Sequence, residues 1–137
     1  MPAHPPSLED TLIAACNLAR DYWTQNKSPC DLLLDSGYLH HGNEITEEMI
    51  LDHVRAHRDL IADWLAYSIN KRVSSGWYFS AEVATGPFVV GYSPGHSPGR
   101  ASMRQFEDGA EACALYIKCE LEGTASSARA IPRAREH

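Results

Sequence analysis

Two histidines, His53 and His57, lie four residues apart in the stretch DHVRAHRD, which spans residues 52–59. Residues at i and i+4 share one face of a helix, so both imidazoles could bind the same metal ion. A catalytic zinc site also needs a third ligand and an open position, and zinc proteases place a glutamate directly after the first histidine. Val54 occupies that place here. A metal-dependent hydrolase that uses His53 and His57 is therefore an alternative hypothesis.

Neither the position of His57 nor the remaining histidines decide whether the chain binds a metal. His57 falls on the apolar line of a helix expected over residues 47–72, and a histidine in such a line is more often a core residue bonded to a neighbour. The sequence therefore favours a structural or interfacial role for it. His40 and His41 could supply further ligands, but they lie in a link whose position the sequence does not determine.

Other reactive residues do not form a recognisable site. None of the four cysteines belongs to a CxxC pair, and Cys16 and Cys113 fall on the apolar faces of expected helices, as small buried residues do. The sequence contains no G-x-S-x-G elbow and no phosphate-binding glycine loop. We therefore expect neither catalysis nor a cofactor.

Helix start signals occur three times in the first half of the chain. Ser7, Ser28 and Thr46 are placed as N-caps, each with an acidic residue in the turn that follows. Apolar spacing predicts helices over residues 8–25 and 47–72, with a short helix between them that ends at Gly37.

After residues 74–76 the apolar period changes from about 3.6 to about 2, which is typical of strands. Two alternating runs around a turn at 84–86 predict a hairpin, and 102–106 predicts a third strand. Asp108 then caps a last helix that ends at Gly123. Blocks of helices and strands indicate an α+β fold: helices, a three-stranded antiparallel meander and a C-terminal helix.

The chain of 137 residues fits one domain. We expect a disordered N-terminus at 1–6, a single domain over 7–123 and a flexible basic tail at 124–137. No apolar run approaches the roughly 20 residues that span a bilayer, and the N-terminus lacks the features of a secretory signal. These features predict a cytoplasmic protein that does not contact membranes.

Charge narrows the range of partners. The net charge is −6, but the tail alone carries +2, which leaves −8 for the rest of the chain. An acidic body repels phosphate backbones, so we expect no nucleic-acid ligand and favour a basic protein partner. Acidic residues follow the outer face of the 47–72 helix, at Glu48, Asp52, Asp59 and Asp63. They are either a solvated face or a docking surface.

Tyr78 is a further candidate contact. Alternation places it on the sheet face opposite Trp77 and Phe79, which the long helix and the last helix should cover. Exposed tyrosines are favoured at protein interfaces. If the first helix covers that second face, Tyr78 is instead a core residue.

The segments GWYF, GPFVVGY and FEDGAEACALYIKCELE, within residues 76–122, form a strand–strand–strand–helix pattern. This pattern is similar to modules of small bacterial α+β proteins, including immunity proteins that neutralise toxins. The resemblance implies a compact acidic binder without catalysis. The leading hypothesis is a non-enzymatic protein-binding module that neutralises a toxin through its acidic surface; the alternatives are the hydrolase and a homodimeric structural adaptor.

Overall fold

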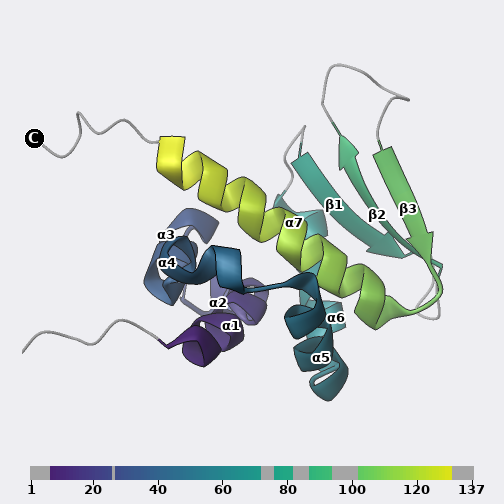
Figure 1. Cartoon of the computed structure of the whole chain (residues 1–137). Coiled ribbons are helices and arrows are strands. Elements are labelled where there is room, and N and C mark those ends of the chain that lie inside the picture. The colour runs from purple at the N-terminus through teal and green to yellow at the C-terminus, as the bar shows by residue number, and fades with distance from the viewer. Residues whose placement is uncertain (1–6, 26, 72–75, 82–86, 94–101, 131–137) are drawn as a thin grey trace, which may run out of the picture.

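The computed structural model describes residues 7–25, 27–71, 76–81, 87–93 and 102–130. The helices before the sheet are α1 (Leu8–Cys16), α2 (Leu18–Gln25), α3 (Pro29–Ser36), α4 (Tyr38–His41), the 3-10 turn η1 (Gly42–Glu44), α5 (Glu47–Ala56) and α6 (Asp59–Lys71). Strands β1 (Gly76–Ala81), β2 (Phe88–Ser93) and β3 (Ser102–Phe106) follow, and α7 (Gly109–Ala130) comes last (Figure 1). This order confirms the α+β fold predicted from the sequence.

The predicted helix caps are present. Ser7, Ser28 and Thr46 each accept a hydrogen bond at 3.1 Å from the backbone N–H three residues later. Gly37 ends α3 with a φ of 85°, a left-handed conformation that a residue with a Cβ rarely adopts. Asp108 caps α7, because its carboxylate accepts from the N–H of Ala110 at 2.9 Å. Local sequence therefore determines where most of these helices begin.

The first predicted helix, 8–25, is wrong as one element. It breaks at Asn17, and α1 and α2 lie on either side. The apolar residues on both sides of the break are all buried, namely Ala15, Cys16, Leu18 and Ala19. These four positions fall within about 160° of one another on a continuous helix, so their burial alone does not require the break. At the break the Cys16 carbonyl accepts the indole N–H of Trp64 at 2.8 Å in place of a helical N–H.

The predicted helix over 47–72 is also wrong as one element, because α5 ends at Ala56 and α6 begins at Asp59. Val54 is the last buried residue of α5, and the buried face of α6 starts at Leu60. Positions six apart do not share a helix face, so the break allows both side chains to enter the core. One consequence is that His57, predicted in the core, is exposed.

The sheet is an antiparallel meander in the order β1-β2-β3. Its register pairs Phe79 with Val90 and Tyr78 with Gly91. Phe79 is buried beneath the helices, as predicted, and so are Phe88 and Val90, while Trp77 is partly buried. Residues 84–86, where the hairpin turn was predicted, lie outside the described residues.

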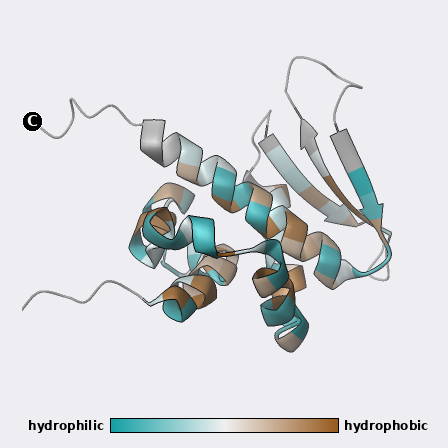
Figure 2. Cartoon of the chain, viewed as in Figure 1, coloured by the Kyte–Doolittle hydropathy of each residue, from teal (hydrophilic) through white to brown (hydrophobic). Residues whose placement is uncertain are grey.

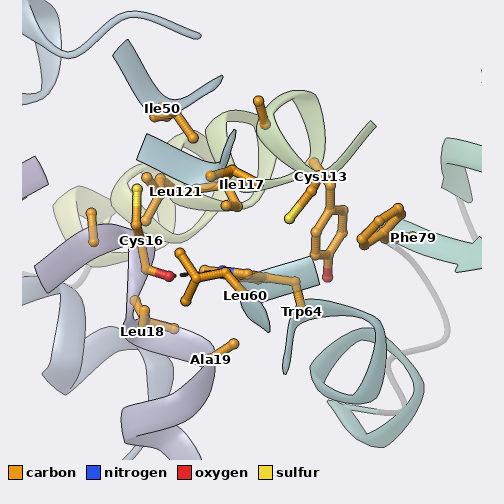
Figure 3. Close-up of a cluster of buried hydrophobic side chains, with 14 of the residues drawn as sticks. Cys16, Leu18, Ala19, Ile50, Leu60, Trp64, Phe79, Cys113, Ile117 and Leu121 are labelled. Carbon is orange, nitrogen blue, oxygen red and sulfur yellow. Dashed lines mark hydrogen bonds between the residues drawn. The ribbon is translucent and has the colours of Figure 1, made fainter. Parts of the chain in front are cut away.

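Helix α7 lies between the sheet and the N-terminal helices (Figure 1). Its buried stripe includes Cys113, Ile117 and Leu121, which meet Trp64 and other residues in the core shown in Figure 3. Cys16 and Cys113 are both fully buried, which confirms their predicted placement.

The predicted end of the last helix at Gly123 is wrong. Helix α7 continues to Ala130, because Ala125 extends the buried stripe that includes Leu121. Residues 124–130 of the predicted flexible tail are thus helical, while 1–6 and 131–137 lie outside the described part of the chain. Within that part, no helix combines the length and the apolar character that crossing a membrane requires.

Candidate functional site

The helix break brings His53 and His57 together. His57 is the residue that follows α5, with a φ of −137° and a ψ of 70°. The two imidazole rings lie 4.5 Å apart between centroids and are tilted by 36°. They line a hollow of about 280 Å³ beside Asn17, Arg20 and Asp59, with Ile13 and Leu60 completing its wall. Partial burial lowers the pKa of His53, and repulsion from His57 lowers it further, so both effects favour a neutral ring.

Arg20 connects this hollow to α6. Its guanidinium bonds to the Asp59 carboxylate and, through Nε at 3.0 Å, to Asp63 Oδ2. The hydrogen bond from Arg20 holds the pKa of Asp59 below its usual value. Two of the four predicted acidic contacts are therefore already paired within the chain. Local sequence gave no signal for these pairs, because 39 and 43 positions separate the partners.

His40 and His41 do not join the first histidine pair. They lie on α4, with ring centroids 5.3 Å apart and planes nearly perpendicular. His41 Nδ1 lies 3.7 Å from a carboxylate oxygen of Glu44. Across the described ranges, no three His, Cys, Asp or Glu side chains are grouped closely enough to hold a metal ion.

The other two predicted acidic contacts, Glu48 and Asp52, lie one helical turn apart on the outer side of α5, with Glu47 beside them. All three are exposed, and in the described part of the chain none forms an ion pair. Figure 2 shows the hydrophilic residues on the turns of α5. We call these three residues the α5 acidic face. The predicted stripe does not continue to Asp59 and Asp63, because the helix breaks between them.

Several other acidic residues are paired. Arg55 bridges Asp108 and Glu111 at 3.1 and 3.4 Å, and Lys27 pairs with Asp35 at 2.7 Å. These pairs compensate negative charge at the start of α7 and along α3. Among the described residues no ion pair compensates the α5 acidic face in this way, so its carboxylates form a negatively charged surface there.

Tyr78 lies on the sheet face opposite Phe79, as the alternation predicted, and its side chain is half-buried. Its ring lies across Gly91, its partner on β2, so closely that a Cβ at Gly91 would collide with it. This close approach explains why position 91 carries glycine. Tyr78 is not next to the α5 acidic face, since it belongs to a different layer of the fold (Figure 1).

Lys118 was not singled out from the sequence, yet it joins α7 to the segment before α5. Its ammonium group donates to Tyr38 Oη and to the backbone oxygen of Ile45, both at 2.8 Å. The Gly42 oxygen and a Glu122 carboxylate oxygen both lie 3.2 Å from the same nitrogen and share its remaining N–H. These bonds hold the approach to α5 against α7 and so position the α5 acidic face.

Three of the four cysteines, Cys16, Cys113 and Cys119, are poorly suited to nucleophilic chemistry. Burial raises the pKa of the Cys16 thiol to about 12 and of the Cys119 thiol, where nearby carboxylates add to the effect, to about 11. Burial likewise raises the pKa of Cys113. The thiolate is the reactive form, so these groups are mostly unreactive at neutral pH.

The arrangement thus offers a histidine hollow, a negatively charged helix face and a half-buried tyrosine on the open side of a sheet. No protein-family model, no curated protein and no solved structure matches this chain.

Proposed function

We propose that this chain is a non-enzymatic cytosolic protein that binds a basic protein partner, such as a toxin, through the α5 acidic face. The observation that carries the proposal is the contrast in charge pairing. Asp59 and Asp63 are paired with Arg20, whereas Glu47, Glu48 and Asp52 are exposed and form no ion pair in the described part of the chain. Glu48 and Asp52 are the proposed contacts.

A carboxylate that is already paired contributes little attraction to an incoming cation, because its charge is partly neutralised. Three exposed carboxylates on two turns of helix repel one another. A basic surface that docks there relieves this repulsion and gains complementary charge, which raises the association rate and the specificity. This reasoning narrows the predicted contact set from four acidic residues to two.

The α5 acidic face is also held in a fixed position. Val54 and Ile50 are fully buried beneath it, and Lys118 ties the preceding segment to α7. A rigid binding surface loses less conformational entropy when it associates than a flexible one does. Tyr78, on another layer of the fold, is proposed as a separate contact only for a partner large enough to reach the sheet.

The test begins with capture of the partner from lysate of the source cell by the tag-immobilised chain. The captured protein is then expressed in cells with and without this chain, and the chain should restore the growth of cells in which the captured protein alone is toxic. The Glu48→Lys/Asp52→Lys variant should lose the partner. A protein retained equally by this variant and the unmodified chain would contradict the proposal.

Glu9→Lys is the matched control. Glu9 is the second residue of α1, as Glu48 is the second residue of α5, and both are exposed. Glu9→Lys and the single Glu48→Lys reversal each change the net charge by +2 and disturb a helix N-terminus in the same way, so the single Glu48→Lys variant, which should also weaken binding, is compared with this control. The Glu9→Lys variant should keep the partner, and loss in both variants would indicate a net-charge effect instead.

A further inference from the structure

Beyond the acidic face, we propose that His53 and His57 form a two-imidazole site for a divalent transition-metal ion that prefers nitrogen ligands, at the junction of α5 and α6. The two rings are 4.5 Å apart between centroids, side by side at the edge of a hollow of about 280 Å³. That hollow leaves room for an ion and for waters in its remaining positions.

The spacing suits a shared ion. Two ring nitrogens each about 2.1 Å from one metal lie roughly 3.0 to 3.4 Å apart, depending on the coordination angle. Neighbouring rings at the present separation reach that geometry by rotating about their side-chain bonds. His57 follows the last residue of α5, so its ring can rotate toward His53 without unwinding the helix.

The surrounding charge favours a cation over an anion. The charged groups that line the hollow are Arg20 from α2 and Asp59 from α6, and Asp63 is bonded to the same guanidinium. Arg20 with its two carboxylates carries a net charge of −1. Asn17 and Ile13, from the α1 side, add no charge. An incoming phosphate would have to displace one of the two carboxylates from Arg20, whereas a cation would not.

The ligand type selects the metal. Neutral imidazole suits zinc, copper and nickel, whereas magnesium and calcium require oxygen ligands. His53 lies within α5 and His57 lies just beyond its end, so an ion that binds both rings stabilises the junction between α5 and α6. Binding to the folded chain alone raises its apparent stability by mass action.

The test is calorimetric titration of the tag-free chain, under a non-chelating phosphine reductant, with Zn²⁺, Ni²⁺ and Mg²⁺. His4, His96 and His137 are replaced by glutamine in every variant, which leaves the two histidine pairs. We expect one Zn²⁺ or Ni²⁺ per chain and no Mg²⁺. His53→Gln and His57→Gln should each weaken affinity by about 100-fold or more, since loss of a mere outer-shell partner already costs about 10- to 100-fold.

The matched control is the double variant His40→Gln/His41→Gln, which removes the other pair and should leave affinity unchanged. Imidazole ring resonances in NMR spectra provide the second readout: those of His53 and His57 should broaden with Ni²⁺ while the fold is retained. The inference is overturned if Zn²⁺ and Ni²⁺ fail to bind, if only the His40/His41 variant loses them, or if inorganic phosphate shifts the same resonances instead.

Discussion

Trp64 donates its indole N–H to the backbone oxygen of Cys16 at 2.8 Å, across 48 positions of sequence. Both residues are fully buried, and Figure 3 shows the bond inside the core. The helix break after Cys16 leaves this carbonyl without its usual helical partner, the N–H four residues on. The tryptophan of α6 supplies the missing donor and so joins the two broken helices.

Replacing Trp64 with phenylalanine should therefore destabilise the fold. The variant leaves the Cys16 oxygen buried without this donor, which costs about 1–3 kcal/mol, and removes ring volume from a packed core. Urea unfolding of the purified variant measures the change. The control is Trp23→Phe, because Trp23 is 49% exposed and its loss should alter stability by no more than about 0.5 kcal/mol. Equal losses in the two variants would refute the role of the bond.

The position of Tyr78 can be tested through Gly91. Gly91→Ala should destabilise the sheet, because the added Cβ would collide with the Tyr78 ring. In a Tyr78→Ala background the same substitution should be milder, giving a coupling of about 0.5–3 kcal/mol in a double-mutant cycle. Additive effects would mean that the ring does not lie across Gly91.

Stability at acid pH should depend on Asp108, the N-cap of α7. Its pKa lies below the usual value: partial burial acts to raise it, but hydrogen bonds from Arg55 and from the N–H of Ala110 outweigh that effect. Because the pKa of Asp108 is depressed in the folded state, its carboxylate adds to the free energy of unfolding above pH 3.8, the ordinary pKa of aspartate. This stabilisation is lost as the pH falls through the pKa of Asp108 in the folded state.

Asp108→Asn tests this dependence, because asparagine caps helices about as well as aspartate but does not ionise near this pH. Urea unfolding midpoints measured from neutral to strongly acid pH should fall less steeply in the variant. Identical pH profiles would show that Asp108 does not contribute to acid unfolding.

The sequence predicted the start of most helices and the alternation of side chains between the two faces of β1 and β2. These features depend on local chemistry: a serine or threonine before a helix, a glycine after it, and strict alternation in strands. The two helix breaks were not predictable in this way. Neither Asn17 nor His57 is a glycine or proline. The first break coincides with a hydrogen bond from the distant Trp64 to the Cys16 carbonyl, and the second lets both Val54 and Leu60 enter the core.

The same limit applies to the candidate site. Local spacing correctly paired His53 with His57 and placed Glu48 beside Asp52. It could not show that Arg20 neutralises Asp59 and Asp63, because such ion pairs depend on how α2 packs against α6. The predicted acidic stripe therefore became a shorter acidic face.

The central claim, that the α5 acidic face binds a basic partner, is tested most directly by the partner's dissociation constant as a function of salt. From about 0.01 M to about 1 M salt the Debye length falls from roughly 30 Å to roughly 3 Å, which screens exposed charges. We predict that affinity weakens steeply with salt for the unmodified chain and for Glu9→Lys, but is already weak and nearly independent of salt for Glu48→Lys/Asp52→Lys. An affinity that does not change with salt in the unmodified chain would contradict the claim.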